Sequence, residues 1–411
     1  MSDNLAPPSE PSPSRSSLGA RLRGLPRDFV LFVIAATLYA FSQSAVNSVF
    51  NNFLNDTYSI SDFQRGLLEL PRELPGFLVV FVSALLYLMS SRRLAALANL
   101  LAGLGIAGIA LSSARYGVML AWLFLFSVGQ HLFMPLIQSI TMEFAAEGKA
   151  GRRLGQVTGA SNLAGIGGSL LILVGFRNLG FGFATAFLIA AGGLLLAALL
   201  IRMMKPDQQP AARTRFVLRR EYKLYYWLSI LYGTRKQIFL TFSPWVLVTI
   251  FKQPTQTVAS LLFAGGLVGI VFNPLLGRAI DRLGERFILM GEAVVLIFVC
   301  FGYGFSRRLF GENTALLVAG ACFILDQLLM SVGMARATYL KKIAVQPGDV
   351  SQTLMMGVSI DHLFSIIVAS LGGLIWVHWG YEYVFLLGVA IACVNLVSAA
   401  RVRIHQRAEF A

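Results

Sequence analysis

Charged side chains stand inside a long apolar stretch of this sequence. Residues 65–76 read RGLLELPRELPG, in which Glu69 and Glu73 are four residues apart and Arg72 lies between them. On a helix these three side chains share one face. Two neighbouring carboxylates cannot both ionise freely in a low dielectric, so one is expected to hold a proton near neutral pH. The two glutamates are therefore candidates for proton coupling; the alternative is a structural Glu–Arg–Glu network.

More polar residues occur near the middle of other apolar stretches, where an ionisable group is costly unless it is paired or hydrated. Taken singly, each is as well explained by a satisfied structural contact as by a ligand site. Together they favour a water-filled path through the protein. We expect Asp361 and His362 to be further proton-coupling groups. The candidates for contact with a solute are Asn47, Arg72, His131, Arg235, Lys236 and Asp326.

The elements that must hold these residues are membrane-spanning helices. Of 411 residues, 56% are hydrophobic and 13% are charged, about half the charge of a soluble chain. The hydrophobic residues form runs long enough to cross a bilayer. They predict an all-α integral membrane protein with twelve helices, at residues 28–51, 64–89, 94–114, 116–143, 154–176, 179–201, 224–250, 256–281, 287–306, 314–339, 352–377 and 380–401.

The basic residues orient these helices. If the N-terminal tail is placed inside, 24 of the 34 Lys and Arg residues fall in inner loops, six in outer loops and four within helices. This asymmetry predicts that both termini are cytoplasmic. The net charge of +14 is then explained by the membrane topology and by contact of the inner loops with anionic lipid. Binding to nucleic acid is not needed to explain it.

The sequence also excludes several functions. A chain with so few charges cannot form the surface of a cytosolic enzyme or a nucleic-acid-binding domain. It contains no phosphate-binding loop, no nucleotide site, no metal-ligand spacing and no nucleophile–base arrangement with local sequence support. We therefore predict a protein that is not an enzyme and has no cofactor or resident metal.

The helices divide into two sets of six. Residues 1–24 are predicted to be a disordered cytoplasmic tail, 25–201 an N-terminal half, 202–223 a basic central loop, 224–402 a C-terminal half and 403–411 a short cytoplasmic tail. Each half carries a Gly-Gly pair in its fifth helix, followed by a short glycine-containing turn and a phenylalanine-containing helix. These similarities indicate an internal repeat.

The loop between the eighth and ninth helices carries a motif. It reads GRAIDRLGER, with Gly277, Asp281, Arg282, Gly284 and Arg286 at its marked positions. This pattern is similar to the signature G-x-x-x-D-R-x-G-x-R of the major facilitator superfamily. In the superfamily the signature is usual after the second helix, where this chain has a leucine, residue 88, in place of the aspartate. The resemblance extends over about residues 28–401.

The resemblance implies two six-helix halves that rock about a central cavity. It implies that helices 1, 4, 7 and 10 line this cavity, so that Asn47, His131, Arg235 and Asp326 would meet the solute. It also implies a cytoplasmic latch in the loop that contains Asp281, whose carboxylate suits the N-terminus of a neighbouring helix.

These observations predict a secondary transporter that moves a small organic solute by alternating access. We favour proton-coupled export by a monomer in the plasma membrane. The alternative is a symporter or uniporter for an anionic solute, with Arg235 and Lys236 as its counter-charges. A membrane protein of another class, an assembly factor that does not transport, is a third possibility that the polar residues inside the helices argue against.

Overall fold

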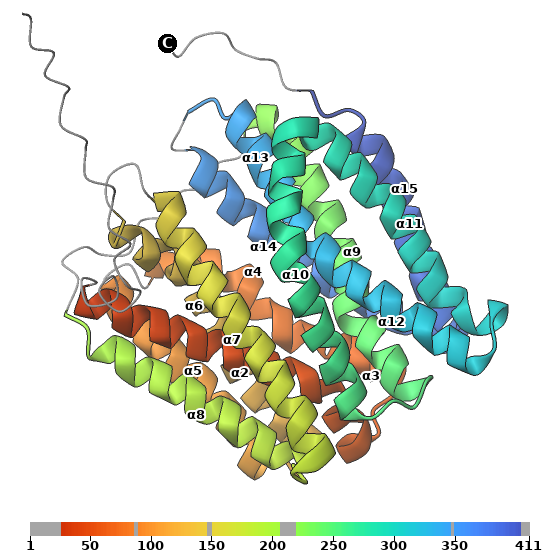
Figure 1. Cartoon of the computed structure of the whole chain (residues 1–411), viewed down its shortest axis with the longest axis horizontal. Coiled ribbons are helices and arrows are strands. Elements are labelled where there is room, and N and C mark those ends of the chain that lie inside the picture. The colour runs from red at the N-terminus through yellow and green to blue at the C-terminus, as the bar shows by residue number, and fades with distance from the viewer. Residues whose placement is uncertain (1–25, 86–88, 146–149, 206–218, 347–348, 404–411) are drawn as a thin grey trace, which may run out of the picture.

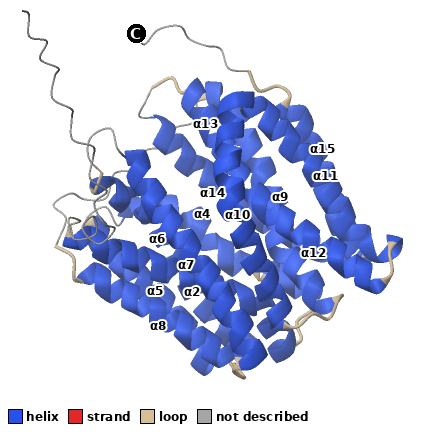
Figure 2. Ribbon diagram, viewed as in Figure 1, coloured by secondary structure: helices blue, strands red, loops and turns tan. Residues whose placement is uncertain are grey.

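The computed structural model describes residues 26–85, 89–145, 150–205, 219–346 and 349–403, and the regular structure in these ranges is helical (Figure 2). The predictions for the tails at 1–24 and 404–411, for the central loop at 206–218 and for Leu88 lie outside the described residues. The helices in chain order are α2 (Arg27–Tyr58), α3 (Asp62–Leu67), α4 (Glu69–Leu85), α5 (Ser91–Ser112), α6 (Tyr116–Glu143), α7 (Ala150–Asn178), α8 (Phe183–Arg202), the short 3-10 helix η2 (Arg220–Tyr222), α9 (Lys223–Thr249), α10 (Thr255–Leu283), α11 (Glu285–Leu309), α12 (Glu312–Leu329), the 3-10 helix η3 (Met330–Val332), α13 (Gly333–Ile343), α14 (Asp349–Trp379) and α15 (Tyr381–Ala399).

Each predicted apolar run coincides with helix over most of its described residues. Ten helical segments among the described residues are long and apolar enough to span a membrane. The two other runs are α3 with α4, and α9, which carry the charged residues singled out above. The short turns predicted near residues 112–116 and 177 are confirmed, because α5 and α6 are separate helices, as are α7 and α8.

Two of the predicted spans are interrupted. The helix breaks at Leu68 between α3 and α4, three residues before Pro71, whose ring cannot donate a backbone hydrogen bond to the preceding turn. The tenth run is divided into α12 and α13 by the 3-10 turn η3, directly after Asp326 and Gln327.

The helices pack as two similar groups, α2–α8 and α9–α15, which are called here the N half and the C half (Figure 1). In the N half α5 packs against α8 and α2 against α7. The corresponding contacts in the C half are α11 with α15 and α9 with α14. The bundle has a terminal face, where α2 begins and α15 ends, and a distal face at the opposite end.

The two halves meet closely near the distal face, where α3 and α4 pack against α14. A Cβ atom on Gly66 would lie 2.4 Å from the carbonyl oxygen of Ala369, so only a glycine allows these backbones to approach so closely. The indole Nε1 of Trp245 donates a hydrogen bond of 2.6 Å to Asp62, and Asn52 donates one of 3.0 Å to the carbonyl of Gln253. These contacts close the distal face.

The halves diverge toward the terminal face. α7 and α10 touch in the middle of the bundle, where a Cβ on Gly266 would meet Ile166 at 2.6 Å. Nearer the terminal face, Gly155 and Gly159 of α7 have nothing within 4 Å of an added Cβ, and neither has Gly277 of α10. The space between the halves is therefore closed at the distal face and open at the terminal face.

A side chain at Gly66 tests this closure. We expect Gly66→Leu to separate the halves at the distal face, because the new side chain overlaps the backbone of α14. Spin labels at Thr57 and Lys252, both exposed, should move apart in electron–electron distance measurements. Gly192→Leu is the matched control, since a Cβ there meets nothing within 4 Å. An unchanged distance in Gly66→Leu would contradict the assignment of this contact as the distal closure.

Candidate functional site

The first polar cluster lies at the distal end of the N half. Arg65 is fully buried and donates to Glu69 at 2.7 Å and to Asn51 at 2.9 Å. Arg72 approaches the same carboxylate oxygen of Glu69 at 3.4 Å. Arg65 is one of the six basic residues assigned above to outer loops, and its burial shows that this assignment is wrong. The capping box at Ser61 starts the helix early enough to carry Arg65 into the protein.

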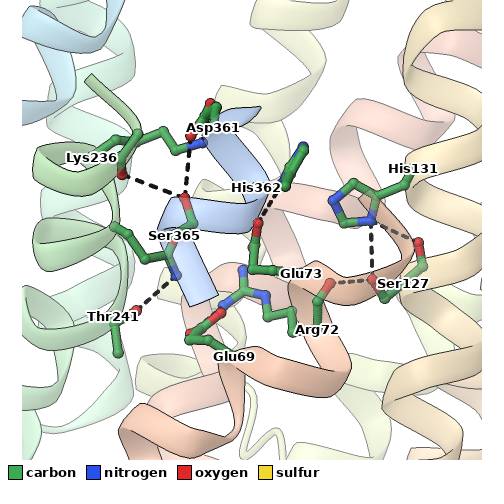
Figure 3. A network of polar contacts seen from close by, with 12 residues as sticks. Glu69, Arg72, Glu73, Ser127, His131, Lys236, Thr241, Asp361, His362 and Ser365 are labelled. Carbon is green, nitrogen blue, oxygen red and sulfur yellow. Dashed lines mark hydrogen bonds and ion pairs between the residues drawn. The ribbon is translucent and has the colours of Figure 1, made fainter. Parts of the chain in front are cut away.

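Glu73 points away from this cluster and joins the two halves. Its Oε2 atom lies 2.6 Å from Nδ1 of His362 on α14, and both side chains are buried (Figure 3). The expectation that Glu69 and Glu73 share one environment is therefore not met. Glu69 has two arginine partners, whereas Glu73 has a histidine from the other half.

His131 of α6 completes this group. Its Nδ1 atom lies 2.9 Å from the backbone carbonyl of Ser127, and its ring meets the His362 ring edge-on with the centroids 4.7 Å apart. A Cβ on Gly76 would lie within 2.8 Å of both rings. The absence of a side chain at Gly76 therefore leaves the space that the two rings occupy.

The geometry of this group differs from that of a metal site. Ligand atoms of Glu73, His131 and His362 lie within 4.8 Å of one another. The 2.6 Å between Glu73 and His362 is shorter than the roughly 3.4 Å between two ligands of a tetrahedral zinc ion with bonds near 2.1 Å. The glutamate and the histidine are therefore hydrogen-bonded directly to each other.

Lys236 and Asp361 form a second contact within the C half. The ammonium group lies 2.8 Å from Oδ2 of Asp361, and Ser365 donates to Oδ1 at 3.2 Å (Figure 3). A Cβ on Gly233 would overlap this carboxylate at 2.2 Å, so the glycine allows α9 and α14 to approach. Asp361 and His362 are adjacent in sequence, and one faces a lysine while the other faces the N half.

Arg235 points to different partners from its neighbour. It binds Asp326 at 2.6 Å and Glu292 at 3.1 Å, and it is 3% exposed. Arg336 lies 3.9 Å from Glu292 and stacks on the ring of Tyr232 at 3.5 Å. Arg235 and Asp326 therefore belong to a buried ion network that links α9, α11, α12 and α13.

Two cavities lie between the halves, on the terminal side of these clusters. The first, of about 450 Å³, is called here the charged cavity. It is bounded by α4 and α6 on one side and by α9, α13 and α14 on the other. Its polar lining residues are His131, Gln138, Tyr225, Ser229, Tyr232, Arg336, Asp361 and His362.

The second cavity, of about 1060 Å³, is called here the amide cavity. It lies between α2 and α7 of the N half and α10, α12 and α13 of the C half. Its polar lining residues are Tyr39, Gln43, Ser44, Asn47, Thr158, Ser161, Asn162, Asn273, Gln327 and Ser331.

The candidate residues are thus divided among several places. Asn47 lines the amide cavity, and His131, Asp361 and His362 line the charged cavity. The remaining candidates within the helices line neither of these cavities and stand in the ion pairs behind them; they are Glu69, Arg72, Glu73, Arg235, Lys236 and Asp326. Sequence reasoning did not identify Asn273 as a site residue, because an isolated asparagine in an apolar run gives no spacing signal.

The motif residues lie at the terminal face, where α10 ends and α11 begins. Gly284 connects these helices with a φ of 81°, a backbone conformation that favours glycine. Asp281, Arg282 and Arg286 are exposed. Next to them Glu285, which the motif does not mark, is fully buried, and its carboxylate lies 2.6 Å from Lys342 of α13.

Comparison with known proteins decides the family. Residues 32–360 match the family model described as Major Facilitator Superfamily. The chain belongs to the major facilitator superfamily. No curated protein matches the sequence at a significant level. The resemblance carried by the motif around Asp281 is thereby confirmed.

Solved structures of superfamily transporters share the fold. A point mutant of the nucleoside transporter NupG has a TM-score of 0.73 and 14% identity, with 90% of this chain and 98% of that chain covered. A D-xylose–proton symporter gives 0.70 and 14%, covering 92% and 97%. A bacterial homologue of the human lysosomal transporter Spinster, in an inward-facing and occupied conformation, gives 0.69 and 14%, covering 93% and 98%.

The superfamily and the geometry agree on the class of protein. The chain is a multi-pass membrane protein with the fold of secondary transporters, and its neighbours are transporters rather than enzymes. The Glu73–His362 contact and the two cavities lie between the halves, where a superfamily transporter changes shape.

Proposed function

We propose that this superfamily member is a secondary active transporter that exports a small organic solute in exchange for protons. It acts as a monomer in the plasma membrane. The basic loops support a cytoplasmic terminal face. With that orientation, the structure is the state open to the cytoplasm.

The observation that carries the proposal is the Glu73–His362 contact. It joins the two halves, and the imidazole of His362 lines the charged cavity, which lies toward the terminal face. A proton held by this pair can exchange through the cavity with the terminal side, while the contacts near Gly66 and Trp245 close the distal side. Rocking of the halves would give the same pair access to the distal side.

Several titratable or charged groups lie next to this pair, on the same helices and on neighbouring ones. His131 on α6 is in ring contact with His362, and Arg72 lies one residue before Glu73 on α4. From the C half, Lys236 of α9 and Asp361 of α14 contact each other beside it (Figure 3). A change in protonation at the pair therefore alters the electrostatics of both halves at their contact.

The anionic-solute alternative receives less support. Its proposed counter-charges, Arg235 and Lys236, are each bonded to a carboxylate of the C half. Arg336 lines the charged cavity but stacks on Tyr232 and lies near Glu292. An assembly role without transport leaves the two polar cavities between the halves unexplained.

Reconstitution tests the function. The purified full-length chain would be placed in liposomes with a pH-sensitive dye, and solutes identified by thermal-shift screening would be added on one side. We expect solute movement to drive proton movement in the opposite direction. Solute flux without any proton movement would contradict the coupling, and proton movement in the same direction as the solute would contradict export by exchange.

The motif gives a separate prediction. Asp281 is exposed in this open state, so Asp281→Asn is expected to leave the thermal stability of the purified protein unchanged. If Asp281 forms a latch when the terminal face closes, the same variant should transport slowly, because the closed state loses a charge at a helix N-terminus. Flux and melting temperature would be measured together, with Asp56→Asn at the distal face as the control. Normal flux in Asp281→Asn would contradict the latch.

A further inference from the structure

The amide cavity has no charged side chain among its lining residues. Its polar groups are side-chain amides and hydroxyls contributed by helices of both halves. The nonpolar part of its wall includes Ile166, Leu262, Ile270 and Leu328. A lining of this kind can donate and accept hydrogen bonds and also contact C–H surface, without providing a counter-ion for a charged solute.

Several of these amides have buried atoms without a hydrogen-bond partner in the described protein. They are Oε1 of Gln43, Oδ1 of Asn273 and Nε2 of Gln327, from three different helices. The set contains two acceptors and one donor. A buried polar group without a partner costs about 1–3 kcal/mol, so a rotation of these cavity-lining side chains that brings the amide atoms to a hydroxyl group of a solute is favourable.

Glycines leave room for this polar wall. A Cβ on Gly265 would overlap the side-chain amide of Gln327 at 2.4 Å, so that amide lies directly against the α10 backbone. Gly155 and Gly159 of α7 leave open space on the side toward the terminal face. The cavity therefore combines an amide that lies against the α10 backbone with open space toward the terminal side.

The charges of the polar clusters already have partners. Glu73 contacts His362, and each cation of the clusters contacts at least one of the other carboxylates; these cations are Arg65, Arg72, Arg235, Lys236 and Arg336, and the carboxylates are Glu69, Glu292, Asp326 and Asp361. A charged solute would have to enter without an available counter-ion or break one of these pairs. A neutral solute needs neither.

We propose that the amide cavity binds an uncharged solute with several hydroxyl groups, in the size range from a polyol to a nucleoside. This inference rests on the proposed transport function and assigns its substrate class. The two cavities then have separate tasks. The amide cavity holds the solute by hydrogen bonds, and the charged cavity gives protons access to the Glu73–His362 pair.

A series of probes that differ mainly in charge tests the class. The purified full-length protein would be incubated with glucose, sorbitol or uridine, and with their charged counterparts glucosamine, glucuronate, sorbitol 6-phosphate and uridine monophosphate. Binding would be measured by thermal shift and by calorimetry. We expect at least one neutral probe to bind and its charged counterparts to bind at least about tenfold more weakly, since a charge would enter without a partner.

Two variants of the cavity and one control variant outside it locate the site. Asn162→Asp places a carboxylate in the amide cavity, whereas Gln156→Glu makes the same kind of change at an exposed position of the same helix that does not line it. We expect Asn162→Asp to weaken binding of the neutral probe about tenfold and Gln156→Glu to leave it unchanged. Gln327→Leu, which removes an unpartnered donor, should weaken binding without preventing folding.

The outcomes separate this inference from the transport function. If a charged probe binds and its neutral counterpart does not, the substrate class is overturned, although transport can still be shown in liposomes. If no neutral probe binds, the class is overturned as well. If a neutral probe binds equally well to the parent protein, to Asn162→Asp and to Gln327→Leu, the assignment to the amide cavity is overturned. Binding without any flux in liposomes would instead contradict the transport function.

Discussion

Glu73→Gln is expected to abolish solute movement driven by a pH gradient while solute exchange across the same membrane continues. The amide cannot take up and release a proton at the contact with His362, whereas the amide cavity on the other side of the bundle is unchanged. Gradient-driven uptake and counterflow would be measured on the same proteoliposomes. In counterflow no net proton movement is needed, so that activity should persist.

The matched control is Glu312→Gln, which neutralises an exposed carboxylate at the start of α12. It should behave as the parent protein in both measurements. If Glu73 serves only to hold α4 against α14, Glu73→Gln should lower the melting temperature and leave the coupling of the folded protein intact. Full uptake driven by the pH gradient in Glu73→Gln would show that Glu73 does not carry the coupled proton.

Arg235→Met is expected to destabilise the protein most severely. Arg235 is buried and binds both Asp326 and Glu292, so its removal leaves carboxylates without their main counter-charge. Loss of one partner of a buried ion pair costs about 3–5 kcal/mol. The melting temperature and the yield of folded protein in detergent would both fall. Arg286→Met, at an exposed arginine, should change neither.

A double variant shows whether the charge or the shape of Arg235 matters. In Arg235→Met combined with Asp326→Leu, one carboxylate is removed with the arginine, and Glu292 retains Arg336 at 3.9 Å. We expect this double variant to regain a large part of the lost stability, since a buried pair can be replaced by apolar residues at little cost. A double variant as unstable as Arg235→Met would indicate that packing, rather than charge, explains the loss.

The sequence predicts the fold well because a bilayer restricts what a spanning segment can be. Apolar runs of about twenty residues must be helices, and the glycines, prolines and basic loops mark their ends. Even the irregular second span follows from Pro71. The motif around Asp281 adds the family, because its glycines and charges have a fixed spacing within one loop.

The partners of the charged residues could not be predicted in the same way. The periodicity of a helix shows that Glu69 and Glu73 lie near one another, but it does not show which other helix each one faces. Glu73 finds its partner 289 residues along the chain, and Lys236 finds its partner 125 residues along. Such contacts depend on how whole helices are packed, which no local pattern records.

Arg65 illustrates a second limit. In sequence it stands at the edge of an apolar run, where a basic residue is usually a loop charge. The capping box at Ser61 and the helix break at Leu68 move it inside, beside Asn51 and Glu69. Its burial depends on the packing of α2 beside α3, because the guanidinium group donates hydrogen bonds to Asn51 of α2 as well as to Glu69.

The distal closure has a consequence for how the protein responds to its surroundings. This closure is made of backbone contacts at Gly66 and short hydrogen bonds from Trp245 and Asn52. At 0.1 M, dissolved salt screens the interactions between exposed charges that are more than about 10 Å apart. It has little effect on direct contacts such as these backbone contacts and hydrogen bonds. The exposed residues Asp281, Arg282 and Arg286 at the opposite end are open to such screening. The ionic strength of the medium should therefore change the balance between the open and closed states mainly through the charges of the terminal face, and little through the distal contacts.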